Sequence, residues 1–96
     1  MTAIKWSPQA VRDVESIRDY IAQDSPRYAQ LTIERIVASV ERLQAFPQSG
    51  RVVPERGDPA IREVIVGPFR VVYRYRSGVV EIATVFRGSR RLPTIE

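Results

Sequence analysis

The side chains with the clearest chemical potential are arginines that alternate with apolar residues in the stretch 61–91. Residues 60–96 hold seven arginines against three glutamates, whereas residues 1–59 hold eight basic and eight acidic side chains. The whole net charge of +4 therefore lies in the C-terminal part of the chain. A guanidinium presents a planar fork of N–H donors that matches phosphate and carboxylate groups. We expect a basic surface that binds something negatively charged.

Two carboxylates, Glu63 and Glu81, lie among these arginines and are the candidates for a general base. The chain has no His and no Cys, which removes the commonest general base, the commonest metal ligand and any thiolate chemistry. Arginine stays protonated near neutral pH and is a poor general acid, and we interpret Tyr73 and Tyr75 as core aromatics. The residue types favour a binding surface over an acid–base site, with no metal and no cofactor.

Two amphipathic helices precede the basic stretch. Ser7-Pro8 and Ser25-Pro26 each place a capping serine before a proline at the first helical position. Apolar residues then recur every three or four positions, which predicts helices over about 8–23 and about 26–45. Since only two residues separate these helices, we expect them to form an antiparallel helical hairpin spanning about 8–45.

Strands are expected on both sides of the hairpin, from short runs of β-branched and aromatic residues. The expected strands are 3–6, 61–66, 69–76 and 79–86. Turn dipeptides join the last three into a β-meander over about 61–87, and the loop 47–60 is rich in proline and glycine. The sequence predicts a single α+β domain, residues 1–96, with the order β-α-α-β-β-β and the helical hairpin packed on one face of a small antiparallel sheet.

Alternation along the strands sorts their side chains between the two faces of the sheet. The set expected beneath the helices is Phe69, Val71, Tyr73, Ile82 and Phe86. The set expected on the open face is Arg70, Arg74, Glu81 and Arg87. Arg62 and Glu63 must point to opposite faces, and which of them joins the open face stays undecided because the pattern does not fix the strand register.

Composition sets the class of protein. At 44% hydrophobic residues the chain can bury one modest core. No apolar run approaches the roughly 18 residues of a membrane-spanning helix, and the start, MTAIKWSPQAV, lacks the apolar segment of a signal peptide. We therefore expect a cytoplasmic protein.

Four segments of the chain are familiar from one group of proteins. They are LQAFPQSGR (43–51), IREVIV (61–66), GPFRVVYRYR (67–76) and VEIATVFRGSRRLP (80–93). Together with the element order, they resemble the ParE/RelE toxin superfamily, the toxin halves of bacterial type II toxin–antitoxin systems. The resemblance covers nearly the whole chain and implies a RelE/ParE-like fold forming a single toxin domain.

The RelE-like branch of this superfamily cleaves mRNA on the ribosome, which requires a base, an acid and cationic phosphate clamps. The resemblance implies Arg70 and Arg87 as clamps in such an endoribonuclease, with Glu63 or Glu81 as the base. The chain lacks the lysine cluster and the final Tyr found in many members. Where many members have a His, this chain has Phe86-Arg87. The sequence therefore argues against an efficient nuclease.

The ParE-like branch inhibits DNA gyrase, blocks replication and arrests growth, and its members are known for plasmid stabilisation. It needs a binding surface rather than an acid–base pair, so we favour this branch and expect a protein that is not an enzyme. The implied target-binding residues are Arg70, Arg74, Arg87, Arg90 and Arg91. A relative without toxicity that binds nucleic acid is a further alternative.

The resemblance also implies a partner, a cognate antitoxin on a separate chain, in a hetero-oligomeric complex. Its C-terminal segment would be disordered when free and would fold on the toxin, which must offer an apolar groove and a strand edge. We expect an acidic, partly helical antitoxin. The candidate antitoxin-binding residues, which could instead belong to the core, are Ile17, Tyr20, Ile21, Tyr28 and Leu31.

Overall fold

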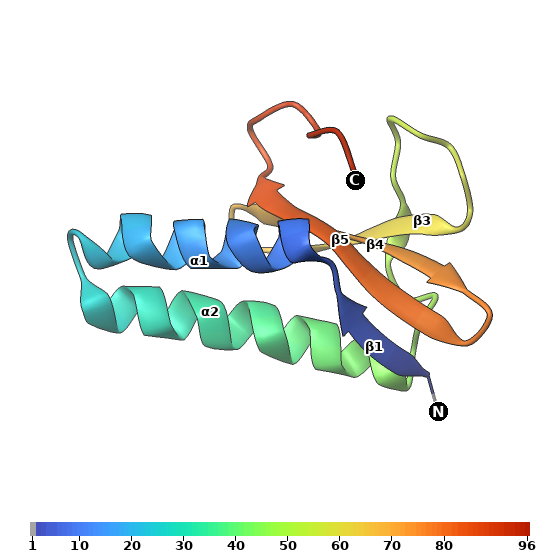
Figure 1. Ribbon diagram of the computed structural model, residues 1–96, viewed down its shortest axis with the longest axis horizontal. Coiled ribbons are helices and arrows are strands. Elements are labelled where there is room, and N and C mark those ends of the chain that lie inside the picture. Colours follow the sequence, from blue (N-terminus) through green and yellow to red (C-terminus); the bar gives the residue numbers. More distant parts are fainter. Residues whose placement is uncertain (1) are drawn as a thin grey trace.

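A helical hairpin packed on one face of a five-stranded sheet forms the fold of this chain (Figure 1). The computed structural model describes residues 2–96. The predicted α+β class is confirmed, and the predicted helices and strands occur in the predicted order with one short strand, β2 (Arg51–Val52), in addition. The elements are β1 (Ala3–Trp6), α1 (Pro8–Ala22), α2 (Pro26–Glu41), the 3₁₀ turn η1 (Arg42–Gln44), β2 (Arg51–Val52), β3 (Ile61–Val66), β4 (Phe69–Arg76) and β5 (Val79–Arg87).

Both helices begin at the serine–proline pairs that the sequence marks. The Ser7 hydroxyl accepts a hydrogen bond from the backbone N–H of Ala10, and the Ser25 hydroxyl accepts one from Tyr28, so each helix start has a side-chain cap. A 3₁₀ turn extends the second helix to within one residue of the predicted end. Within residues 2–96, no helix combines the length and apolar character needed to cross a membrane.

The sheet is mixed rather than purely antiparallel, which corrects one detail of the sequence-based prediction. Its strand order is β1-β5-β4-β3-β2, and β1 runs parallel to β5. Every other neighbouring pair is antiparallel. The crossover from β1 through both helices and the meander brings the first strand beside the last. The short β2 lies inside the segment expected to be a loop and pairs with Arg62 and Glu63 of β3.

A β-bulge in β5 changes which side chains share a face. Val72 pairs with Thr84, but the next residue, Tyr73, pairs with Ile82, so Ala83 has no partner on β4. Beyond this point the alternation of β5 is inverted. The expected positions of Phe86 beneath the helices and of Arg87 on the open face are therefore wrong.

The consequence appears at the end of β5. Phe86 joins Val72 in a small cluster on the face away from the helices. Arg87 pairs with Phe69, whose ring belongs to the main core beneath the helices, so Arg87 extends on that side. The rest of the expected core set lies as predicted: Phe69, Val71, Tyr73 and Ile82 pack with the helices.

Helix α1 holds the bulge in place. The Ser7 hydroxyl donates to the carbonyl of Ala83 at 2.9 Å while it caps α1. One carboxylate oxygen of Asp13 accepts from the Thr84 hydroxyl at 2.6 Å and from the backbone N–H of Val85 at 3.0 Å. Because β1 ends at Trp6, opposite Ile82, no strand could satisfy that N–H on this edge. Asp13 takes the place of a neighbouring strand.

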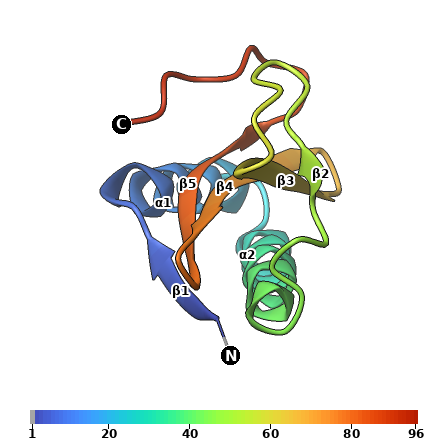
Figure 2. The same ribbon diagram turned by 90° about the vertical axis from the view of Figure 1, so that its right-hand side faces the viewer.

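The face away from the helices is covered rather than open. Val53, Ile61, Val72 and Phe86 form a second small core, and Leu92 and Ile95 of the C-terminal segment pack against it. Figure 2 shows this segment and the loop between β2 and β3 on the side of the sheet opposite α2. The segment is also attached to α1. The Gln9 side chain donates to the carbonyl of Thr94 and accepts from the backbone N–H of Glu96, and Arg12 forms an ion pair with Glu96.

The hydrogen bonds of Asp13 generate a prediction about stability. The Asp13→Ala substitution leaves the N–H of Val85 and the Thr84 hydroxyl without an acceptor, and a buried unsatisfied group costs about 1–3 kcal/mol. We expect the free energy of unfolding, measured by urea titration, to fall by about that amount. Glu15→Ala, two positions along the same helix at an exposed side chain, is the matched control. Equal stability of the two variants would contradict the role assigned to Asp13.

Candidate functional site

Arg70, the candidate phosphate clamp, is held by two carboxylates. Its Nε donates to Glu63 at 2.6 Å, and its two Nη atoms donate to the two oxygens of Glu55 at 2.7 and 2.8 Å. The second oxygen of Glu63 accepts from the Nε of Arg51 at 2.6 Å. The guanidinium of Arg70 also lies over the ring of Phe86, 5.0 Å from its centroid. The register thus places Glu63, not Arg62, on the face of Arg70.

Burial and pKa shifts describe a closed, charge-balanced cluster. The Arg70 side chain is 11% exposed and that of Glu63 is fully buried. The hydrogen bonds from Arg70 lower the pKa of Glu55 to about 2, and the Glu55 carboxylate raises the pKa of Arg70. The two arginines and two glutamates sum to zero charge. Both arginines of the cluster are bonded to carboxylates, so neither is a free cation for phosphate.

The other predicted nuclease residues do not join this cluster. Glu81 pairs across the sheet with Arg74 at 2.9 Å, and Arg74 also donates to the backbone carbonyl of Glu96. Arg87 lies on the helix side of the sheet, away from Arg70. Among residues 2–96 there is no group of three or more Asp or Glu side chains that could hold a metal ion. The four candidate catalytic residues do not form one constellation.

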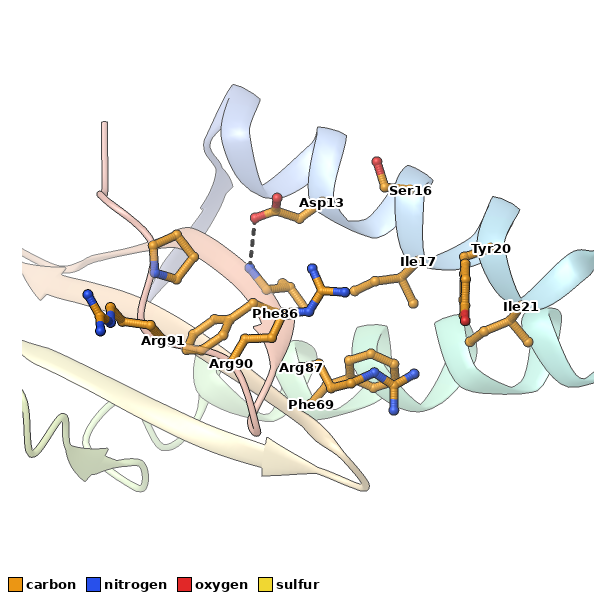
Figure 3. A pocket seen from close by; sticks show the side chains of 12 residues that line it. Asp13, Ser16, Ile17, Tyr20, Ile21, Phe69, Phe86, Arg87, Arg90 and Arg91 are labelled. Carbon is orange, nitrogen blue, oxygen red and sulfur yellow. Dashed lines mark hydrogen bonds between the residues drawn. The ribbon is translucent and has the colours of Figure 1, made fainter.

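A groove of about 440 Å³ lies between α1 and the end of β5 (Figure 3). Its lining residues are Asp13, Ser16, Ile17, Tyr20, Ile21, Phe69, Val85, Phe86, Arg87, Arg90, Arg91 and Pro93. Tyr20 and Ile21 lie at one end of the groove and Arg91 at the other. The groove thus combines an apolar part, contributed by α1, β4, β5 and the segment after β5, with three arginines from the end of β5 and that segment.

The three arginines of the groove differ from Arg70 because they are exposed. In the part of the chain that the structure describes, none of Arg87, Arg90 and Arg91 forms an ion pair. Arg87 stacks on Phe69, with its Cζ 5.2 Å from the ring centroid. This cation–π contact orients the guanidinium. Among the described residues no ion pair joins them to Asp13, whose bound oxygen accepts hydrogen bonds from β5.

The structure brings together two residue sets that the sequence treats as separate. Ile17, Tyr20 and Ile21 of the candidate antitoxin set line the same groove as Arg87, Arg90 and Arg91 of the candidate target set. The remaining antitoxin candidates, Tyr28 and Leu31, lie on α2 outside the groove, with 53% and 40% of their surface exposed.

Six residues that line the groove are not among the binding candidates from the sequence: Asp13, Ser16, Phe69, Val85, Phe86 and Pro93. Ser16 precedes Ile17 on α1 and could have been included from helical spacing. Strict alternation along β5 would put Val85 on the same face as Glu81, and only the bulge brings it to the helix side. Pro93 follows the strand, and no local pattern shows where the chain goes after β5.

Comparisons with known proteins agree on the family. The family model described as the ParE toxin of the type II toxin–antitoxin system parDE matches residues 4–92. The chain belongs to the ParE toxin family. Toxin RelE2 of Caulobacter vibrioides is 32% identical over 91 residues, covering 94% of this chain and 99% of that protein. Y4kP of Sinorhizobium fredii is 33% identical over 93 residues, covering 96% and 94%.

A solved structure supports the ParE-family fold. The chromosomal ParDE TA system from P. aeruginosa contains a chain that superposes with a TM-score of 0.75 at 27% identity, covering 91% of this chain and 96% of that one. The ParE/RelE superfamily resemblance is thus confirmed, and the chain is a type II toxin of the ParE family. The names of its relatives include both ParE and RelE, so they do not separate the two branches by target.

The Arg70–Glu55 pair generates a prediction about pH. A carboxylate whose pKa is lowered on folding, from 4.5 to about 2 for Glu55, stabilises the fold above pH 4.5, and this contribution is lost as the pH falls toward 2. The difference in unfolding free energy between the wild type and Glu55→Gln should therefore be largest above pH 4.5 and shrink toward pH 2. Its size is reduced by solvent screening, because the Glu55 side chain is 42% exposed.

Urea titrations at a series of pH values between 2 and 7 measure this difference. Glu41→Gln, at an exposed position on α2, is the control for loss of one negative charge. A Glu55 difference that stayed constant with pH would mean that the ion pair adds nothing to the stability of the loop.

Proposed function

We propose that this ParE-family toxin inhibits DNA gyrase, stabilising its complex with cleaved DNA, and does not cut mRNA. The observation that supports this proposal is that carboxylates already accept hydrogen bonds from the guanidinium of Arg70. All three donor-bearing nitrogens of its guanidinium are bonded to Glu55 or Glu63. A nuclease would need this arginine free to stabilise the charge that develops on the scissile phosphate.

The remaining chemistry of an endoribonuclease is also lacking at this surface. Both oxygens of the candidate base Glu63 accept hydrogen bonds from arginines, and its side chain is fully buried. The other candidate base, Glu81, is paired with Arg74. Arginine does not deprotonate at neutral pH and cannot replace the missing acid. A protein that acts by binding needs none of these groups.

Among the predicted target-binding residues, the arginines available for a target are those of the groove. Of the five predicted target-binding residues, Arg70 and Arg74 are engaged in ion pairs and partly buried. Arg87, Arg90 and Arg91 are exposed and close together, so we assign the contact with the gyrase–DNA complex to them. Exposed guanidinium groups suit both phosphate and carboxylate groups on such a target.

We further propose that a separate antitoxin chain neutralises this toxin in a hetero-oligomeric complex. The solved ParDE TA system of P. aeruginosa, which shares the fold, supports this assignment. Action on gyrase places the toxin in the cytoplasm. Growth arrest through blocked replication, and stabilisation of a plasmid that carries the pair of genes, would follow from the same mechanism.

Two assays on the purified chain separate the branches. We expect inhibition of gyrase supercoiling with accumulation of cleaved DNA, and no cleavage of mRNA on ribosomes. Cuts in mRNA together with normal supercoiling would overturn the proposal and would mean that the Arg70 cluster opens on the ribosome. Salt-sensitive binding of nucleic acid with neither activity would support the non-toxic relative instead.

Replacing Arg87, Arg90 and Arg91 together by Ala should weaken gyrase inhibition on the order of 100-fold, because three exposed charges leave the contact surface. The matched control replaces Arg35, Arg42 and Arg56 by Ala, which removes the same charge from exposed positions outside the groove. Concentration series in the supercoiling assay measure both variants. Equal inhibition by the two folded triple variants would show that the groove arginines do not contact gyrase.

A further inference from the structure

We propose that the groove between α1 and the end of β5 binds single-stranded DNA, with phosphates on Arg87, Arg90 and Arg91 and a base stacked on Tyr20. This assignment rests on the proposed function, because it names the part of the gyrase–DNA complex that the groove contacts. It adds a ligand class, single-stranded DNA, and a contact residue, Tyr20, that is not an arginine.

The charge of the groove is unbalanced. Its lining holds three arginines and one carboxylate, that of Asp13, so its formal charge is three minus one, or +2. Within residues 2–96 no ion pair joins the arginines to a carboxylate. One oxygen of Asp13 accepts two hydrogen bonds from β5. Guanidinium groups in this state suit phosphates, and a DNA strand supplies one phosphate with every nucleotide.

The backbone that carries these arginines is held in place. The guanidinium of Arg87 lies over the ring of Phe69, with Cζ 5.2 Å from its centroid. The backbone N–H of Gly88 donates to the carbonyl of Pro68, and that of Arg90 donates to the carbonyl of Arg87, which closes a turn. The segment is therefore ordered before a ligand binds, and less conformational entropy is lost when phosphates are bound.

Tyr20 offers an aromatic surface in the same groove. It is 67% exposed, although it lines the groove together with buried Phe69. In Figure 3, Tyr20 lies toward one end of the groove and Arg91 toward the other, with Arg87 and Arg90 between them in this view. Every base has a flat face that stacks on an aromatic ring, whatever the sequence. A strand along the groove therefore meets both phosphate-binding groups and a base-stacking group.

The combination of arginines with an exposed ring favours nucleic acid over a protein segment with carboxylates. Grooves that hold single strands use this combination, with cations along the backbone and aromatic rings beneath the bases. A duplex matches the groove less well, because its bases are stacked on one another and do not reach Tyr20. The strand ends of cleaved DNA can leave the stack, so single-stranded DNA is the ligand that fits the proposed target.

Fluorescence anisotropy measures the binding directly, without gyrase. The probe is a labelled oligothymidylate of about 12 nucleotides, a length in the range of single-strand sites. Three phosphate contacts predict that the logarithm of the binding constant falls with the logarithm of the salt concentration, with a slope of about −2. Oligouridylate of the same length should bind no more tightly than the DNA. A preference of about tenfold or more for this RNA would overturn the choice of DNA.

Substitutions at Tyr20 test the stacking. Tyr20→Leu keeps an apolar side chain but removes the ring, so affinity for the single strand should fall about fivefold or more. Tyr20→Phe keeps the ring and should bind at least about fivefold more tightly than Tyr20→Leu. The matched control, Phe46→Leu, changes an aromatic side chain that is 65% exposed outside the groove. It should bind as the wild type does, within a factor of about two.

A duplex of the same length tests whether the ring reads an unstacked base. Tyr20→Leu should change affinity for the duplex by less than about twofold, because no base of the duplex reaches the ring. An equal loss on the duplex and on the single strand would overturn the stacking of a base on Tyr20. Equal binding of the single strand by Tyr20→Leu and the wild type would overturn it as well.

Two triple variants test the phosphate contacts. Changing Arg87, Arg90 and Arg91 to Ala should weaken binding at least about tenfold and bring the salt slope close to zero. Changing Arg35, Arg42 and Arg56 to Ala should leave the slope near −2, since these exposed side chains lie outside the groove. Equal losses in the two variants, or no binding by the wild type, would overturn the proposal.

Supercoiling assays on the same variants separate this proposal from the proposed function. If both hold, Tyr20→Leu weakens gyrase inhibition and Phe46→Leu does not. Gyrase inhibition by a toxin that does not bind the oligonucleotide would leave the proposed function standing and would overturn the DNA site. Binding with the predicted Tyr20 and salt dependence, but without gyrase inhibition, would support the DNA site and would overturn the proposed function.

Discussion

The bulge at Ala83 is the constraint on which the groove beside α1 depends. One residue without a partner on β4 inverts the alternation of β5, sending Phe86 to one side of the sheet and Arg87 to the other. The bulge exposes backbone groups that need partners, and α1 supplies them through Ser7 and Asp13. The helix is thus attached to the sheet at the point where the sheet changes its pattern, and the groove forms beside that attachment.

The five arginines predicted to bind a target fall into two classes with different consequences. Arg70 and Arg74 are bonded to carboxylates on the sheet, where they hold the loop before β3 and the C-terminal segment against the second core. Arg87, Arg90 and Arg91 are exposed beside apolar side chains. The first class stabilises the fold and the second is available to a partner, so a basic composition alone does not locate a binding surface.

The sequence predicts most of the fold and part of the site. The serine caps and helical spacing identify the hairpin, and strand alternation assigns Phe69 to the core correctly. It fails at Arg87, because the bulge is stabilised by contacts with α1 that lie far away in the chain. The sequence pattern also does not predict the hydrogen bonds between Arg70 and Glu55. Glu55 lies in an irregular loop, which has no periodicity from which to place its carboxylate. Both failures concern contacts between distant segments, which local patterns do not encode.

The parallel pairing of β1 with β5 also governs when the toxin can form during synthesis. Residues 3–6 must wait for residues 79–82 before the sheet closes, and the Ser7–Ala83 hydrogen bond has the same long separation. Such non-local contacts slow folding because a long loop must be closed first. The groove arginines leave the ribosome later still. A nascent chain therefore has neither the closed sheet nor the groove until β5 and the segment after it have been made.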